Sequence, residues 1–275
     1  MTTQIIMAGN ESFETPLFKN RVKSMLKLDF YRLFHTPVFY IMLVIAAIIP
    51  AMVLALSVAD ASPPSSNAAY STNTTQMDMP VYDNTWQLIE STGGSAVAEN
   101  PLDFAGFANI NMLFIFAGLL ISIFVAHDYS SGFVKNIFTV HSKKTDYVIA
   151  KSAVGVFSGA GMVVTYVLGT VLAGVIAGKA FDVNVSGLIL CLISKTLLMG
   201  VFCSLFLSIA VFFREKLWLT IVFTFLFGMM LYPAASVATL SSTVVTMLIS
   251  LVAGIIGAVA IGSVSGYILN HRDLA

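Results

Sequence analysis

The sequence predicts an all-α integral membrane protein with six transmembrane helices, preceded by an N-terminal amphipathic helix at the membrane surface. Of the 275 residues, 57% are hydrophobic and 10% are charged, whereas soluble domains average about 25% charged residues. Six apolar stretches are each long enough to cross a hydrocarbon core of roughly 30 Å as a helix. They run from Val38 to Ala59, Phe107 to Ala126, Ser152 to Ala177, Gly187 to Phe213, Leu217 to Leu240 and Val244 to Leu269.

The segment before the first span has the pattern of an amphipathic helix. From Pro16 to His35, apolar residues recur at three- and four-residue spacing with basic residues between them. Such a helix suits the headgroup layer, and His35-Thr36-Pro37 then turns the chain into the first span. An ordinary helix packed on a soluble partner is the alternative. The apolar residues are Leu17, Phe18, Val22, Leu26, Phe30, Leu33 and Phe34.

The placement of lysine and arginine predicts the orientation, because these residues gather on the cytoplasmic side of spans. All but two of them flank the spans on one side, which places both termini in the cytoplasm of a bacterial plasma membrane. We therefore expect a cytoplasmic N-terminus over 1–37, a transmembrane domain over 38–269 and a tail over 270–275. The residues on that side are Lys19, Arg21, Lys23, Lys27, Arg32, Lys135, Lys143, Lys144, Lys151, Arg214, Lys216 and Arg272.

The two longest connections differ in character. The extracellular loop over 60–106 has six acidic residues and no basic one. Its first part is linker-like, and its second part is either a short helix or hairpin over the outer mouth or a solvated loop. The cytoplasmic loop over 127–151 is polar, but Phe133, Val134, Ile137 and Phe138 recur at helical spacing. We expect a short helix there that provides a docking surface.

The ordered combination of these features resembles the ABC-2 type permeases, the six-span membrane subunits of bacterial ABC exporters. The likeness covers nearly the whole chain. It rests on the amphipathic helix, on Asp128 four residues before Gly132, and on a basic, polar stretch that leads to Lys151. Family members commonly have a proline-serine-arginine turn where this chain has His141-Ser142-Lys143-Lys144.

The resemblance implies a type V exporter-like fold with an elbow helix before span one. It also implies a permease that pairs with a second, identical or different permease and with two cytoplasmic ATPase subunits, which bind ATP and Mg. The loop between spans two and three contacts the ATPase in that family and would be the coupling loop here. The coupling residues would be Asp128, Gly132, Phe133, Lys135, Phe138, Lys143, Lys144 and Asp146.

The chain has no glycine-rich phosphate loop ending in lysine and a hydroxyl residue, so we expect a non-enzymatic subunit without a cofactor. The nearest stretch, Gly174 to Ala180, has the wrong glycine spacing. His35, His127, His141 and His271 are scattered without metal-ligand spacing, so no metal site is expected. The expected partners are the ATPases, a second permease and the lipid bilayer, and no nucleic acid.

Three polar residues are candidates for the substrate pathway. Lys195 lies deep in the fourth span, where an ionisable residue is costly and often marks a pathway. Alternatively, it snorkels to the headgroups or pairs with Asp103 or Asp182. Asn109 and Asn111 open the second span and either contact substrate or satisfy backbone and headgroups.

The expected cargo is amphipathic or lipidic. The acidic outer loop would attract cationic peptides, which favours an antimicrobial peptide, while a drug, a lipid or a polysaccharide remains open. Two other classes of function remain open. One is a membrane scaffold or sensor whose inner loop recruits a soluble partner. The other is a gradient-driven carrier, which usually needs titratable or broken-helix ion sites at mid-membrane, where Lys195 is the only candidate charge.

Overall fold

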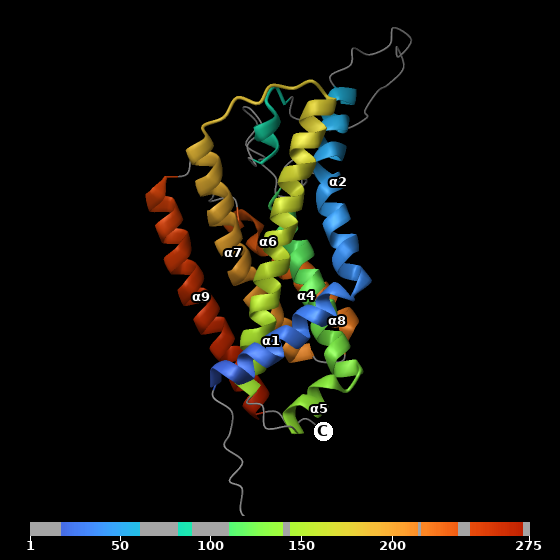
Figure 1. Ribbon diagram of the computed structural model, residues 1–275, viewed down its shortest axis with the longest axis vertical. Helices are drawn as coiled ribbons and strands as arrows, with labels where there is room; N and C mark the ends of the chain where they lie inside the picture. Colours follow the sequence, from blue (N-terminus) through green and yellow to red (C-terminus); the bar gives the residue numbers. More distant parts are fainter. Residues whose placement is uncertain are drawn as a thin grey trace, which may run out of the picture.

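The computed structural model describes residues 18–60, 82–89, 110–139, 144–213, 216–235 and 243–271. Every regular element in these ranges is a helix, and the long helices stand side by side as a bundle (Figure 1). The elements are α1 (Phe18–Phe34), α2 (Pro37–Asp60), the 3-10 helix η1 (Thr85–Leu88), α4 (Met112–Ser130), α5 (Phe133–Thr139), α6 (Lys144–Ile176), α7 (Val185–Phe213), α8 (Leu217–Ala235) and α9 (Val244–His271).

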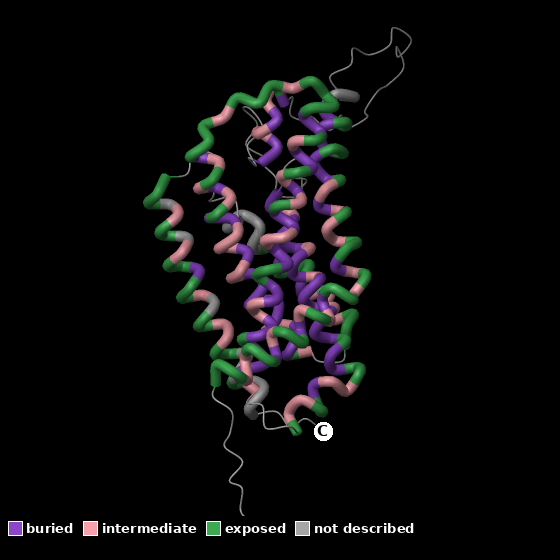
Figure 2. Tube along the Cα trace, viewed as in Figure 1, coloured by how far each residue is buried: buried purple, intermediate pink, exposed green. Residues whose placement is uncertain are grey.

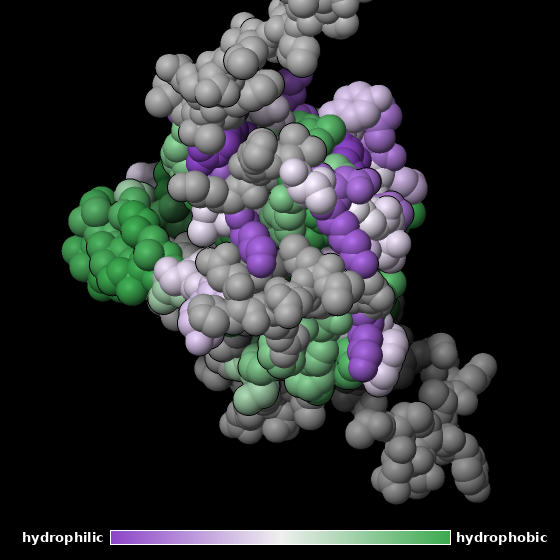
Figure 3. Space-filling view, turned by 90° about the horizontal axis from the view of Figure 1, so that it is seen from below, coloured by the Kyte–Doolittle hydropathy of each residue, from purple (hydrophilic) through white to green (hydrophobic). Residues whose placement is uncertain are grey.

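The predicted amphipathic helix is present as α1, within two residues of its expected bounds. It lies across one end of the bundle, and only His35 and Thr36 separate it from α2. The short helix expected after span two is also present as α5, at the same end (Figure 1). We call this the elbow end. Seen from there, hydrophilic side chains are interspersed with apolar ones on the described surface (Figure 3).

Five of the six predicted spans are helices long and apolar enough to cross a membrane: α2, α4, α6, α7 and α9. The apolar part of α8 that the structure describes, Leu217–Met230, is shorter than the roughly 20 residues a span needs. The third span begins earlier than predicted. Its helix starts at Lys144 rather than Ser152, because Tyr147, Val148 and Ala150 are buried and extend the packed surface toward the elbow end.

The centre of the bundle is α4, most of whose residues are buried, whereas α9 lies at the edge and exposes apolar side chains (Figure 2). Among the described helices, α7 with α9 and α2 with α6 pack over the largest surfaces. Glycine permits the latter approach, because a Cβ on Gly169 would lie 2.3 Å from the carbonyl oxygen of Ala47. Apolar side chains exposed on the outside of the bundle, such as Ile48 and Leu168, suit contact with lipid.

Candidate functional site

The elbow helix buries one narrow stripe of its surface. Met25, Asp29 and Leu33 follow one another at four-residue spacing, and all three are buried. Residues at this spacing share a helix face, so Asp29 lies within an otherwise apolar contact. A buried carboxylate is costly unless it has a charged partner. The partner comes from α6.

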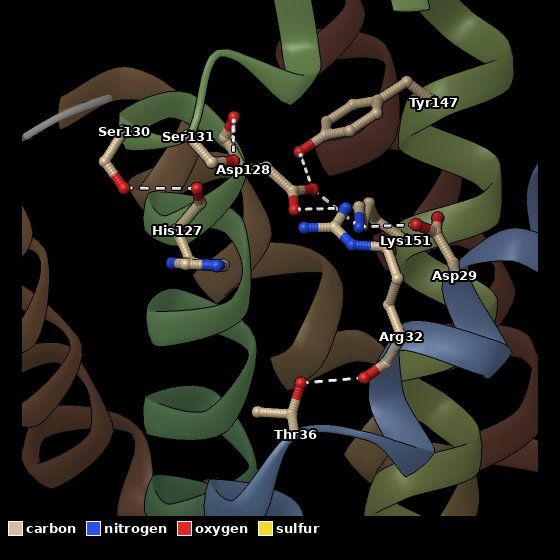
Figure 4. Close-up of polar contacts among 9 residues, drawn as sticks. All are labelled: Asp29, Arg32, Thr36, His127, Asp128, Ser130, Ser131, Tyr147 and Lys151. Carbon is tan, nitrogen blue, oxygen red and sulfur yellow. Dashed lines mark hydrogen bonds and ion pairs between the residues drawn. The ribbon is translucent and has the colours of Figure 1, made fainter.

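Asp29 belongs to a group of four buried or nearly buried charged residues, which we call the charge cluster: Asp29, Arg32, Asp128 and Lys151. Lys151 donates through Nζ to Asp29 Oδ1 at 2.7 Å and lies 2.6 Å from Asp128 Oδ2. Arg32 Nη1 lies 2.7 Å from Asp128 Oδ1. The carboxylate of Asp128 thus faces the guanidinium of Arg32, the ammonium of Lys151 and the hydroxyl of Tyr147 (Figure 4).

The cluster is balanced, with two acids and two bases. The side chains of Asp29, Asp128 and Lys151 are all 0% exposed, whereas Arg32 keeps 20% of its surface in contact with solvent. Burial raises the pKa of the Asp29 carboxyl above its ordinary value, and the neighbouring Lys151 opposes that shift. Loss of Lys151 would be costly, because it would leave the buried carboxylate of Asp29 without a cation.

Aromatic rings enclose the cluster and connect it to the short helix α5. The ammonium of Lys151 lies 3.9 Å from the ring centroid of Phe124 on α4. The guanidinium of Arg32 lies 3.8 Å from the ring centroid of Phe133, the first residue of α5. Cation–π contacts of this kind are worth roughly 0.5 to 2 kcal/mol, depending on desolvation. The elbow helix therefore contacts α4, α5 and α6 through charged side chains.

Another ion pair, outside the charge cluster, joins the beginning of the elbow helix to α6. Arg21 Nε donates to Asp146 Oδ2 at 2.9 Å, and the Asp146 side chain is 1% exposed. Asp146 lies in the first turn of α6, where a carboxylate also interacts favourably with the helix dipole. Two ion-pair contacts therefore bind α1 to the part of α6 that precedes the predicted span.

The predicted coupling residues separate into a buried group, Asp128 and Asp146, and a group on or beside α5. Asp128 and Asp146 are both paired with arginines of α1. Gly132 joins α4 to α5 with φ of 72°, a conformation that favours glycine.

The other predicted coupling residues lie on or beside α5. Phe133 packs on Arg32, Phe138 packs edge-on against Tyr147 at 5.8 Å, and Lys135 is exposed. Lys144 begins α6, and Lys143 lies outside the described residues.

Two of the three pathway candidates meet inside the bundle. Lys195 of α7 donates through Nζ to Asn111 Oδ1 at 2.7 Å, next to the start of α4. Lys195 is 1% exposed and Asn111 is 0% exposed, so the lysine does not snorkel to the surface. The third pathway candidate, Asn109, and the alternative acid Asp103 both lie outside the described residues. Asp182 lies exposed in the connection between α6 and α7.

At the end opposite the elbow, residues 82–89 pack into the bundle. Asn84 donates to the carbonyl of Asp182, Thr85 N donates to the carbonyl of Ala180 at 2.9 Å, and Tyr166 Oη donates to the carbonyl of Leu88 at 2.8 Å. Tyr166 stands ten residues before the end of α6, which is about 15 Å at ~1.5 Å per residue. The segment, left open by the sequence as helix, hairpin or loop, therefore contains a 3-10 helix and descends into the bundle.

Lys195 and Tyr166 lie at similar depth. Lys195 follows the first residue of α7 by ten positions, and α6 and α7 pack together as consecutive helices joined by a short connection. A Cβ on Gly159 of α6 would lie 2.2 Å from Met199 Cγ of α7, which fixes their relative register. The 3-10 helix η1 therefore packs on α6 and α2 at a level close to that of the Lys195–Asn111 pair, toward the end opposite the elbow.

Sequence reasoning missed Asp29 and Arg32 as site residues. The available signal was the position of Asp29 within the apolar stripe of a helix, together with an unexplained lysine at the start of a span. Within the described residues, no group of three His, Cys, Asp or Glu side chains is placed to hold a metal ion.

Comparison with known proteins gives a family match over residues 25–231, to the model described as "ABC-2 family transporter protein". The match begins within α1 and ends within α8. It includes the whole charge cluster and the Lys195–Asn111 pair. Searches of curated proteins and of solved structures found no match.

Proposed function

Since the chain belongs to the ABC-2 family of transporter membrane proteins, we propose that it is the permease subunit of an exporter driven by ATP hydrolysis on separate subunits. Two cytoplasmic ATPases bind ATP and Mg, and a second permease, identical or different, completes the pathway. The elbow end faces the cytoplasm of a bacterial plasma membrane. The abundance of lysine and arginine at that end supports this orientation.

The observation that carries the proposal is the charge cluster. It joins the elbow helix to α4 and α6, and Arg32 also packs on Phe133 at the start of α5. A displacement of α5 by an ATPase would therefore reach α4 and α6 through short, buried contacts rather than through a loop. Packed elements with few alternative arrangements transmit such movements efficiently.

Within the coupling loop, the two groups of residues have different roles. Gly132, Phe133, Lys135, Phe138, Lys143 and Lys144 form the surface that the ATPase contacts. Asp128 and Asp146 anchor that surface to the elbow helix, because both are buried against its arginines.

The substrate is amphipathic, such as a membrane-active peptide, a drug or a lipid. A mostly apolar bundle with a buried polar pair, Lys195 and Asn111, supports this class. Asn109 is a further pathway residue. The six acids of 60–106 would concentrate cationic molecules at the outer mouth.

The test is co-expression of the chain with candidate ABC ATPases, followed by purification and measurement of ATP hydrolysis. Lys135→Glu should abolish co-purification, because it reverses an exposed charge on the docking helix. Asp128→Asn should keep the ATPase bound but reduce substrate-stimulated hydrolysis, because the guanidinium of Arg32 loses its carboxylate. Lys179→Glu, in the connection at the opposite end, is the matched charge reversal and should change neither property.

Each result bears on one step of the proposal. Failure of every ABC ATPase to associate with the intact chain would favour a scaffold and contradict the exporter. Equal loss of association in Lys135→Glu and Lys179→Glu would show that α5 is not part of the docking surface. Full substrate-stimulated ATP hydrolysis in Asp128→Asn would show that the charge cluster does not transmit movement from the ATPase.

A further inference from the structure

Ligand sites are commonly cavities of roughly 300 to 1,000 Å³. A cavity of about 440 Å³ lies at the corner between the elbow helix and α2. Its walls come from three places: the His35–Val38 link, the last two turns of α4, and Leu217 at the start of α8. Phe124 separates it from the charge cluster, since the same ring packs on Lys151. The cavity is therefore distinct from the cluster.

One wall of this cavity is polar. The polar residues there are His35, Thr36, His127 and Ser130. Nδ1 of His35 lies 2.7 Å from the carbonyl oxygen of Tyr31, so Nε2 is its other ring nitrogen for a ligand. The imidazole of His127 points away from the carboxylate of Asp128 (Figure 4). The hydroxyls of Thr36 and Ser130 donate only to nearby helix carbonyls, at 2.8 Å and 3.1 Å. Such local bonds exchange readily for a bond to a ligand oxygen.

Positive potential accompanies the polar wall. Leu217 is the first residue of α8, and the first N–H groups of a helix have no partner within it and carry a partial positive charge. The exposed Lys216 immediately precedes it. A helix start and two histidines at the cavity, with a lysine next to the lining residue Leu217 in the chain, match the chemistry of a phosphate group.

The other wall is apolar and leads out to the lipid-facing surface. Val38, Ile123 and Phe124 line it. Beyond it, α2 exposes Ile41 and Val44, and α8 exposes Val222 and Phe225. A ligand that fits both walls has an anionic head and an aliphatic body that continues into the bilayer.

The position of the cavity agrees with that ligand. It opens where the chain turns from a helix at the membrane surface into a span, which is the level of the headgroups. Basic pockets between spans at this level bind anionic lipid headgroups in membrane proteins. We propose that this cavity binds one anionic glycerophospholipid from the leaflet at the elbow end, with its phosphate against His127 and the start of α8.

The experiment uses the full chain in nanodiscs that contain equal amounts of phosphatidylglycerol and phosphatidylcholine. A photo-crosslinking residue is placed at Leu217, which lines the cavity, or at its neighbour Trp218, which is exposed. Mass spectrometry then gives the ratio of the two lipids attached at each position. We expect the phosphatidylglycerol ratio to be about tenfold higher at Leu217 than at Trp218, as ~1.4 kcal/mol of preference would give.

Variants then identify the groups responsible. His127→Ala combined with Lys216→Gln should reduce the ratio at Leu217 to the value at Trp218. Lys23→Gln removes the same charge from an exposed position on the elbow helix and should leave the ratio unchanged. Gel filtration and thermal unfolding check that each variant is folded.

Three results would overturn the proposal. The first is an equal ratio at Leu217 and Trp218 in the unmodified chain, a comparison that does not depend on any cavity variant folding. The second is an equal loss of preference in Lys23→Gln, which would indicate general surface charge. The third is full preference in a folded His127→Ala and Lys216→Gln variant.

Discussion

Asp29 and Lys151 are separated by 122 positions in the chain, yet Lys151 Nζ lies 2.7 Å from Asp29 Oδ1 and both side chains are 0% exposed. The contact joins the elbow helix to the start of a transmembrane helix. Because both groups are buried, Asp29 depends on Lys151 to remain charged at a tolerable cost, whereas Lys151 is also paired with Asp128. The stability of this end of the molecule is therefore sensitive to single charge changes.

Lys151→Met should lower the free energy of unfolding by about 3 to 5 kcal/mol, because it leaves buried carboxylates without their shared cation. Asp29→Asn in the same chain should recover part of this loss, because it removes one of those carboxylates. Detergent-induced unfolding of the four proteins in the double-mutant cycle measures the coupling. A coupling energy near zero would contradict the pairing of Asp29 with Lys151.

The pH dependence of stability should include a contribution from Asp29. Burial raises its pKa above the ordinary value of 3.8, so the folded chain holds this proton to higher pH than the unfolded chain does. The contribution to stability is therefore full below pH 3.8 and is lost as pH rises through the raised pKa.

Unfolding of the unmodified chain and of Asp29→Asn, compared over the same pH range, isolates this contribution, because the other carboxyl groups are common to both proteins. The stability of the unmodified chain relative to the variant should decline above pH 3.8. A relative stability that rises with pH would mean that Lys151 dominates and that the pKa of Asp29 is lowered.

Gly169→Ala should destabilise the bundle by about 1 to 3 kcal/mol, as overpacking does. The new Cβ would lie 2.3 Å from the backbone oxygen of Ala47, and backbone atoms of a packed helix yield little. Gly161→Ala is the matched control on the same helix, since its Cβ would lie 3.7 Å from Leu43 Cδ2. The control should gain up to about 1 kcal/mol from helix propensity. Equal thermal shifts in the two variants would refute the close approach of α2 and α6.

Lys195→Met should reduce export more than it reduces stability, if this residue contacts the substrate. The substitution removes the Lys195 donor from the buried Asn111 Oδ1, which should lower the free energy of unfolding by about 1 to 3 kcal/mol. Adding Asn111→Leu should therefore restore stability without restoring export.

Transport into inverted vesicles that contain the cognate ATPase measures the export part of this prediction. Lys179→Met, in the connection between α6 and α7, is the control for the loss of a lysine. Recovery of export together with stability in the double variant would show that Lys195 has only a structural role.

The helical architecture could be predicted from the sequence, because an apolar stretch in lipid must satisfy its own backbone hydrogen bonds and a helix does so. The bounds of α1 and the presence of α5 also followed from spacing alone. The early start of α6 at Lys144 could not be predicted from apolarity. It depends on Asp146 and Lys151 being paired with α1, which is a tertiary contact.

The candidate site was predicted less completely, for a physical reason. Asp128 and Asp146 were expected on a docking surface, and the structure buries both against arginines of the elbow helix. Whether a charge faces solvent or a partner is decided by the approach of another helix, which spacing within one segment does not encode. The pair of Lys195 with Asn111 likewise joins two helices 84 positions apart.

Tyr166 holds residues 82–89 in place through a main-chain oxygen, the carbonyl of Leu88. Every residue type has a main-chain carbonyl oxygen, so this hydrogen bond can form with any side chain at position 88. Only the burial of that side chain, at 2% exposure, restricts the choice to apolar residues of similar size. Position 88 can therefore change to another apolar residue while the segment stays at the same depth in the bundle.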